Sequence, residues 1–281
     1  MGRKFDGVLL VSDFDNTLLD TDTPLRLGGE VPPLSEKNKA ALRYFTDNGG
    51  LFTIATGRAL SAFLPYAPLV PMNAPAIVCN GAALYDFARG EYTESLTLPA
   101  KVHPLAQTVL DRFPALAAEA YHLENRIYLV QPNAHARRHQ HVTHVDVTEL
   151  ADLALVPEGL GKVLFEADHA DLAAAHDWIE AQPWRAEYEL QFSASTILDI
   201  TAKGASKGGM VRRLAEKLGV SMAHVYCAGD ESNDLSMLLA AAEGFAPANC
   251  TDAVRNAGVT IVSHCSEDAM ADIVDILDRR Y

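Results

Sequence analysis

Two aspartates, Asp13 and Asp15, lie two residues apart directly after an apolar segment that begins at Val8. Carboxylates this close repel each other unless a cation or a shared proton reduces the cost. A hard divalent ion such as Mg²⁺ takes oxygen ligands and often acts on phosphate groups. Because Asp and Asn are also ordinary turn residues, these positions alone are equally compatible with an acidic turn at the end of a strand.

Three further polar groups of residues lie at comparable places along the chain. The sequence TGR at 56–58 follows the apolar segment 51–55, Lys207 begins a helical pattern, and GDESND at 229–234 follows the apolar segment 224–228. In open α/β sheets, ligands bind outside the carboxyl ends of the strands. Since each group lies where a predicted strand ends, we expect all of them to converge on one crevice with the two aspartates.

With these residues in view, the chain resembles the haloacid dehalogenase superfamily, specifically its Cof-type phosphatases with a large C2-type cap. The four motifs of that superfamily match DFDNT at 13–17, TGR at 56–58, Lys207 within SKGG, and GDESND at 229–234. NGA at 80–82 is similar to the point where such proteins leave the core for the cap. The resemblance implies a Rossmann-like core and a phosphatase activity.

The resemblance also assigns roles to the two aspartates. It implies that Asp13 is the nucleophile, which forms an aspartyl phosphate, and that Asp15 is the general acid and base. P-type ATPases are similar around their nucleophile but carry Thr at the second position, where a long-lived phosphoenzyme is useful, so Asp15 favours turnover. Asn16 departs from the many members that carry Gly there. Sucrose-phosphate phosphatases have a similar DNT, which favours a sugar phosphate as substrate.

Other motif residues offer donors for the oxygens of a phosphoryl group. The hydroxyl of Thr56 and the ammonium of Lys207 suit non-bridging oxygens, whose charge must be held through the transition state. Each alone also fits a plainer role, a turn residue for Thr56 and a solvated helix residue for Lys207. A cation at a helix N-terminus opposes the helix dipole, however, which a nearby anion explains. The further phosphate contacts that we expect are Asn16, Thr17, Gly57, Arg58, Asn80, Gly81 and Asn233.

A Mg²⁺ site is expected among the same residues. Its protein ligands would be the carboxylates of Asp13 and Asp230 and the backbone carbonyl of Asp15, with water and phosphate completing an octahedron. Asp234 would lie behind these ligands and orient Lys207 or a metal-bound water. The segment 229–234 is also rich in residues that cap helices, and both interpretations can hold.

Composition limits the partners and the compartment. The formal net charge is −14 for 281 residues, which argues against nucleic acid, because binding to nucleic acid depends on basic patches. An anionic substrate then needs local cations that override the overall field. No apolar segment reaches the ~18 residues of a membrane helix and no signal peptide is recognisable, so we expect a cytoplasmic protein without membrane contact. The four cysteines lack CxxC spacing, which favours reduced, buried thiols.

The pattern of apolar residues predicts an α/β fold with an inserted α+β segment. Strands are expected at 7–12, 51–55, 76–79, 91–98, 126–131, 162–166, 187–192 and 224–228. Helices are expected at 36–48, 101–112, 169–180, 207–218, 234–242 and 267–280. Residues 1–82 and 203–281 would form one discontinuous Rossmann-like core with a parallel sheet. Residues 83–202 would form an α+β cap that determines substrate specificity, with two helices on one face of a small antiparallel sheet.

One basic stretch of the cap, 135–144, contains His135, Arg137, Arg138, His139, His141 and His144. Its spacing lacks the paired pattern of structural zinc sites, and no cysteine lies near. A solvated basic loop or helix is the favoured interpretation, and contact with a substrate anion or a metal site are the alternatives.

Together these observations favour a Mg²⁺-dependent phosphomonoesterase that acts on a small soluble phosphate ester, with a sugar phosphate preferred. A sugar phosphomutase is the nearest alternative, because related mutases share the core and both aspartates but retain the phosphoryl donor for a second transfer. A non-catalytic protein that binds a phosphorylated ligand is disfavoured, since it has no use for both a nucleophile and an acid. Neither the physiological substrate nor the oligomeric state follows from the sequence.

Overall fold

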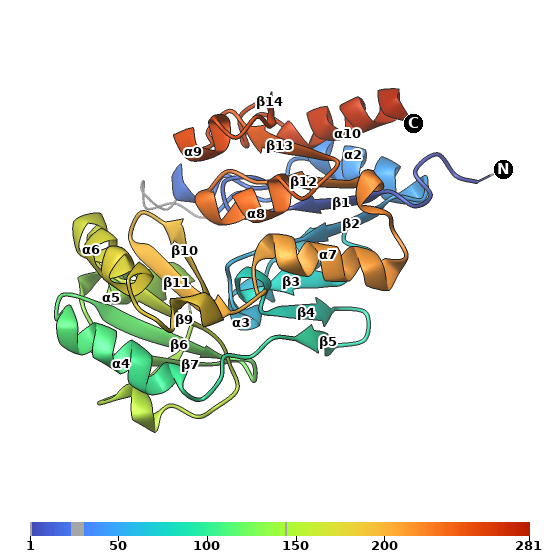
Figure 1. Ribbon diagram of the computed structural model, residues 1–281. Coiled ribbons are helices and arrows are strands. Elements are labelled where there is room, and N and C mark those ends of the chain that lie inside the picture. The colour runs from blue at the N-terminus through green and yellow to red at the C-terminus, as the bar shows by residue number, and fades with distance from the viewer. Residues whose placement is uncertain (1, 24–30, 144) are drawn as a thin grey trace.

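The computed structural model describes residues 2–23, 31–143 and 145–281. Two lobes are visible in Figure 1, one carrying both ends of the chain and the other formed by the green and yellow middle segment. The first lobe is built on a five-stranded parallel sheet of order β14-β13-β12-β1-β2. Its strands are β1 (Leu9–Ser12), β2 (Leu51–Ile54), β12 (Val225–Ala228), β13 (Glu243–Pro247) and β14 (Thr260–Val262).

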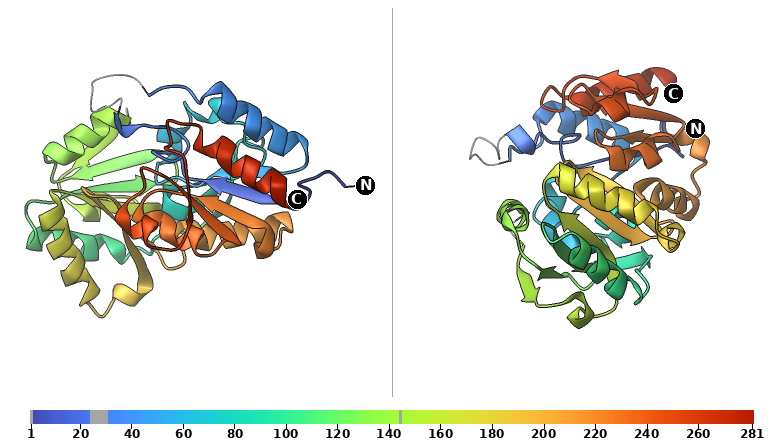
Figure 2. Two further views of the ribbon diagram at one scale, coloured as in Figure 1. Left: turned by 90° about the horizontal axis from the view of Figure 1, so that it is seen from above. Right: turned by 60° about the vertical axis from the view of Figure 1, so that its left-hand side comes forward.

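Helices cover both faces of this parallel sheet because its strands are apolar on both sides. In β1, Leu10 packs in one hydrophobic cluster, whereas Leu9 and Val11 pack in the other. The first face is covered by α2 (Glu36–Asp47) and α10 (Ala269–Arg280), which lie side by side in Figure 2, and by the short helix α3 (Leu60–Phe63). The opposite face is covered by α7 (Lys207–Leu218), α8 (Leu235–Leu238) and α9 (Asp252–Arg255).

Local capping explains where α2 and α7 begin and where α7 ends. The hydroxyl of Ser35 accepts a hydrogen bond from the backbone N–H of Asn38 at the start of α2. Ser206 caps α7 in the same way through Gly209, immediately before Lys207. Gly219 ends α7 with a φ of 68°, which glycine adopts without steric cost.

A three-stranded antiparallel sheet extends the first lobe. It contains β3 (Ala76–Val78), β4 (Ala83–Asp86) and β5 (Glu91–Ser95) in sequence order. A bridge between Ala55 and Ile77 connects it to the end of β2. Leu84 packs in the same cluster as Met210 of α7. The hairpin 83–95 therefore packs against the helix that carries Lys207, although the sequence places it within the inserted segment.

The second lobe is a six-stranded sheet of order β10-β11-β9-β6-β7-β8. Its strands are β6 (Ala117–His122), β7 (Arg126–Val130), β8 (Val147–Leu150), β9 (Leu160–Glu166), β10 (Tyr188–Ala194) and β11 (Ile197–Ala202). Helices α4 (Val102–Arg112) and α6 (His169–Glu180) share one hydrophobic cluster, whereas α5 (Ala134–Thr143) contacts another. The sheet is antiparallel as predicted except for the parallel pair β7 and β8.

The structure corrects several boundaries and adds strands that the sequence did not suggest. The helix predicted at 234–242 is only the short α8, preceded by a 3₁₀ turn over Ser232–Asp234. Strand β6 has the sequence AAEAYH, whose alanines favour a helix, and β13 contains Gly244 and Pro247. Both form strands because their neighbours in the sheets bury them.

Two further predictions concern the cysteines and membrane-spanning helices. All four cysteines lie within the described residues and are free and buried, as predicted. In the part of the chain that the structure describes, no helix combines the length and apolar character needed to cross a membrane.

Candidate active site

The carboxyl ends of the parallel strands and the start of α7 surround one cavity of about 340 Å³. Parallel pairing of β1 with β2 and β12 places the residues that follow these strands on the same edge of the sheet. The second lobe closes the other side. Lining residues from the first lobe include Asp13, Asp15, Asn16, Gly57, Arg58, Lys207, Asp230 and Asn233, and those from the second include Tyr121, His139, Lys162 and Ser193.

Asp13 faces this cavity from the end of β1 and is only 6% exposed. Its Oδ1 lies 2.8 Å from Nζ of Lys207. Burial and the neighbouring carboxylate of Asp234 raise the pKa of Asp13 to about 7, although Lys207 acts in the opposite direction. Lys207 alone therefore does not compensate for the burial of the Asp13 carboxylate, the predicted nucleophile.

Lys207 is fixed between two carboxylates. It is 1% exposed, and its Nζ lies 2.6 Å from Oδ1 of Asp234 as well as close to Asp13. Oδ2 of Asp234 accepts hydrogen bonds from the backbone N–H groups of Asp230 and Glu231. Because both oxygens of Asp234 are occupied in this way, its geometry suits the orientation of Lys207 better than direct coordination of an ion.

Asp230 lies on the other side of Asp13. Its Oδ1 accepts a hydrogen bond of 2.6 Å from the hydroxyl of Thr17, so the side chain of Thr17 orients this carboxylate, while the backbone N–H of Thr17 stays the predicted phosphate donor. Burial and the negative charge of Asp13 raise the pKa of Asp230 well above its ordinary value. Carboxylate oxygens of Asp13, Asp230 and Asp234 lie within 4.8 Å of one another. Within this group, the buried carboxylates of Asp13 and Asp230 are the oxygen ligands that fit Mg²⁺, and Asp234 lies behind them.

We expect Mg²⁺ to stabilise the protein more at pH 8 than at pH 5. Since its folded-state pKa is raised, the carboxyl of Asp13 stabilises the metal-free fold at low pH, and this contribution is lost as the pH rises through about 7. Mg²⁺ at about 100 times its Kd should raise the Tm by roughly 5 °C or more at pH 8. Thermal melts at both pH values test this, and in Asp13→Asn the contribution of Asp13 to the pH dependence should disappear. An equal shift at both values would contradict it.

Asp15 forms an ion pair with Arg58, the last residue of the TGR motif at 56–58. Nε and one terminal nitrogen of the guanidinium lie 2.8 and 2.6 Å from the two carboxylate oxygens, a bidentate arrangement. The guanidinium also lies 5.3 Å from the ring centre of Phe14 and 5.0 Å from that of Tyr66. Burial opposes ionisation of Asp15, but Arg58 outweighs it and lowers the pKa of this carboxyl. Without substrate, Asp15 is therefore in the form of a base.

Asn80 links the two lobes next to the phosphate motifs. Its amide nitrogen donates a 2.9 Å hydrogen bond to Asp199 on β11, and its amide oxygen accepts one of 2.9 Å from Asn233. Asp199 also pairs at 2.8 Å with Lys162 on β9. Since Asn80 and Asp199 are completely buried, this series of hydrogen bonds is a fixed connection between the lobes. Both Asn80 and Asn233 use their side chains for this connection, and the Oδ1 of Asn233 is buried with no hydrogen-bond partner among the described residues.

Two of the expected phosphate contacts have local structural reasons of their own. Asn16 has a φ of 54°, a conformation that favours Gly or Asn, and its side-chain oxygen accepts hydrogen bonds from Thr21 and Asp22. Gly81 has a φ of 96°, and a Cβ there would lie 2.2 Å from the carbonyl oxygen of Ser206. Gly81 therefore allows the start of α7 to approach, which the sequence did not reveal.

Thr56 and Gly57 lie where the sequence places them, in the turn after β2. Thr56 is completely buried, and its hydroxyl accepts a hydrogen bond of 3.1 Å from the backbone N–H of Arg58. A Cβ on Gly57 would lie 3.1 Å from the side-chain oxygen of Asn80. The motif residues are thus brought together, while their roles toward a phosphate remain predictions.

The residues that the second lobe contributes were missed by sequence reasoning, except for His139. Tyr121, Lys162 and Asp199 lie on strands of the six-stranded sheet. A lysine inside the apolar segment GKVLFE was the one signal available for Lys162. The basic stretch 135–144 forms most of α5, where Arg137 and Arg138 are exposed as predicted. His139 instead points inward and lines the cavity, which corrects the solvated interpretation, and His144 lies outside the described residues.

The chain belongs to the haloacid dehalogenase-like hydrolase family, whose model matches residues 10–274. This confirms the predicted family and the prediction that the protein is an enzyme of the haloacid dehalogenase-like hydrolase class, in which the relatives below are named as phosphatases. A pyridoxal phosphate phosphatase of Escherichia coli K12 is 26% identical over 95% of this chain and 97% of its own. An HMP-PP phosphatase of Yersinia enterocolitica is 27% identical over 94% and 92%.

Solved structures support the fold class. A sugar phosphatase of subclass IIB of the haloacid dehalogenase superfamily has a TM-score of 0.79 and 20% identity, and the match covers 96% of this chain and 98% of that one. The α/β prediction with a Rossmann-like parallel-sheet core and an added α+β lobe is thereby confirmed.

Proposed function

We propose that this protein is a Mg²⁺-dependent phosphomonoesterase that transfers the phosphoryl group of a small metabolite to Asp13 and then to water. The observation that carries the proposal is that Asp13, Asp15, Lys207 and Asp230 all line one cavity. A protein that only binds phosphate needs cations. This site instead places the buried carboxylate of Asp13 beside Lys207, and the carboxylate of Asp15 lines the same cavity.

The reaction divides into two displacements at phosphorus. An oxygen of Asp13 attacks, the bond from phosphorus to the ester oxygen breaks, and protonated Asp15 donates its proton to the departing alkoxide. Asp15 then takes a proton from water, whose oxygen attacks the same phosphorus and releases inorganic phosphate and free Asp13. Lys207 and the hydroxyl of Thr56 hold the non-bridging oxygens throughout.

Mg²⁺ would be held by the carboxylates of Asp13 and Asp230 and by the backbone carbonyl of Asp15. When bound, it neutralises the negative charge shared by these carboxylates and the phosphate. Thr17 fixes one oxygen of Asp230, and Asp234 fixes Lys207, so the protein itself keeps these groups oriented.

The cavity volume suits a small metabolite, and we propose a phosphorylated sugar or a compound of similar size. The similarity to phosphatases named for pyridoxal phosphate, HMP-PP and sugar substrates supports a small phosphate ester. We propose the segment 83–202 as the cap that excludes water and contacts the leaving group. Within it, the separate hydrophobic cluster begins at Leu98, after the hairpin that packs on the core.

Release of inorganic phosphate from a panel of phosphorylated sugars, nucleotides and cofactors tests the proposal directly. We expect turnover with Mg²⁺, loss of activity with EDTA, and recovery on addition of Mg²⁺. Transfer of the phosphoryl group between positions of a sugar without release of phosphate would instead favour the phosphomutase. Full activity of metal-stripped protein, or no activity on any ester while ligands still bind, would contradict the proposal.

A further inference from the structure

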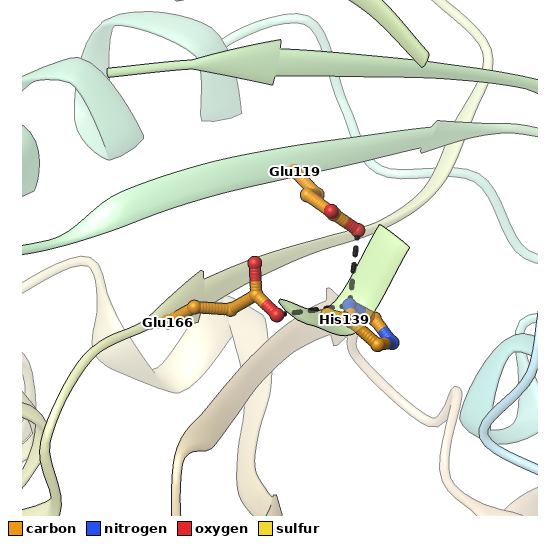
Figure 3. Close-up of side chains that lie close together, drawn as sticks. All are labelled: Glu119, His139 and Glu166. Carbon is orange, nitrogen blue, oxygen red and sulfur yellow. Dashed lines mark ion pairs between the residues drawn. The ribbon is translucent and has the colours of Figure 1, made fainter. Parts of the chain in front are cut away.

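A buried cluster of charged side chains lies on the cap side of the cavity. It consists of Glu119 on β6, Glu166 on β9 and His139 on α5 (Figure 3). The two glutamates are 0% and 1% exposed, whereas the side chain of His139 is 19% exposed. None of these residues belongs to the four motifs, and the proposed reaction does not use them.

The two carboxylates hold one edge of the imidazole. Nδ1 of His139 lies 2.8 Å from Oε1 of Glu166 and 3.3 Å from Oε2 of Glu119. The hydroxyl of Tyr121 donates a 2.7 Å hydrogen bond to the same oxygen of Glu119 and fixes that carboxylate. Burial disfavours the charged imidazole, but the two carboxylates outweigh burial and raise the pKa of His139 to about 10. The ring therefore carries a proton on each nitrogen.

The other edge of the ring faces the cavity. Nδ1 is itself buried, so the exposed part of His139 belongs to the opposite side of the imidazole, which lines the cavity. Figure 3 shows the second ring nitrogen, Nε2, pointing away from both glutamates. No described side chain pairs with Nε2, whereas the cations that share the lining are bound to carboxylates, Lys207 to Asp13 and Lys162 to Asp199.

We propose that His139 is a specificity-determining residue whose Nε2–H donates a hydrogen bond to the leaving group of the substrate. The inference rests on the proposed function and narrows its substrate class. Because His139 already faces two buried carboxyl groups at its Nδ1 edge, a neutral acceptor such as a hydroxyl, carbonyl or ring nitrogen suits the Nε2 donor better than a second anion. Phosphate esters with such an acceptor are preferred over plain alkyl or aryl esters.

The experiment compares kcat/KM for pyridoxal 5′-phosphate and glucose 6-phosphate, which are rich in acceptors, with phenyl phosphate, which lacks an acceptor beyond the ester. His139→Leu should lower kcat/KM on the better acceptor-rich substrate by about tenfold to hundredfold, the scale of a hydrogen bond from a charged donor. Phenyl phosphate should change by less than about threefold. His141→Leu, an exposed position on the same helix, is the matched control.

Removal of the imidazole leaves two buried carboxylates without a cation, so the single variant can lose its fold. The triple variant Glu119→Gln, His139→Leu and Glu166→Gln removes these charges together, and it should show the same substrate-dependent loss. Equal losses on all substrates, or no loss on any, would overturn the role of His139. One equivalent of Zn²⁺ that copurifies with the protein and is absent from the triple variant would show a metal site instead. If the wild type hydrolyses none of the three esters, the result would count against the proposed function itself.

Discussion

Asp13→Asn should lower kcat by about four orders of magnitude or more while the fold persists, because the amide has nearly the same shape but is no longer an anionic nucleophile. The buried position supports an intact fold. Asp13 is 6% exposed, and its raised pKa shows that its charge is costly there without a metal. At pH 8 without Mg²⁺, the variant should therefore be at least as stable as the wild type.

Steady-state phosphate release and thermal melts measure the two parts of this expectation. Acid-quenched mixtures with substrate should contain phosphorylated Asp13 in the wild type and none in the variant, as read by mass spectrometry. Asp252→Asn, an exposed carboxylate at the start of α9, is the matched control and should keep its activity within about twofold. Comparable kcat for wild type and Asp13→Asn would refute a covalent mechanism through this residue.

The convergence of the motif residues was predictable from the sequence because it follows from one rule of topology. Strands that are apolar on both faces form parallel sheets, and their carboxyl ends then lie together. That rule alone predicts that Asp13, after β1, and Asp230, after β12, lie close together. Caps such as Ser35 and Gly219 were also readable, since each acts within a few residues of itself.

Contacts between residues far apart in the sequence were not predictable in the same way. Asn80 and Asp199 are 119 positions apart, and their hydrogen bond depends on how the second lobe packs against the first. Glu119 and Glu166 lie in strands where a charged residue normally faces solvent, yet both are buried because His139 from α5 meets them. Periodicity assigns a residue to a face, but it does not say what covers that face.

The ion pair between Asp15 and Arg58 shows a further limit, because both residues belong to recognised motifs and only their pairing was missed. The sequence suggests Arg58 as a contact for phosphate, whereas the structure pairs it with Asp15, the proposed general acid. A carboxyl whose pKa is lowered by an arginine is a poor proton donor. Substrate phosphate must draw Arg58 away, or raise the pKa of Asp15 by its own charge, before the first transfer.

Asp15→Asn should therefore separate the two halves of the reaction. With a sugar phosphate, the departing alkoxide needs a proton, and kcat should fall by roughly 10² to 10⁴. With p-nitrophenyl phosphate, the leaving nitrophenolate is stable without a proton, so transfer to Asp13 should persist. Hydrolysis of the aspartyl phosphate should then be slow, because no base activates water. The backbone carbonyl of residue 15 is unchanged in this variant, so the expected Mg²⁺ site is retained.

A stopped-flow measurement resolves these steps. The variant should release about one equivalent of nitrophenol per enzyme in a fast burst and then stall, and phosphorylated Asp13 should accumulate in the same samples. Arg58→Ala is the informative companion, because removal of the guanidinium should raise the pKa of Asp15 and shift the basic limb of the kcat/KM profile for sugar phosphates to higher pH. Equal loss of the transfer step on both substrates in Asp15→Asn, with no burst, would mean that Asp15 only shapes the loop after β1 and that the acid lies elsewhere.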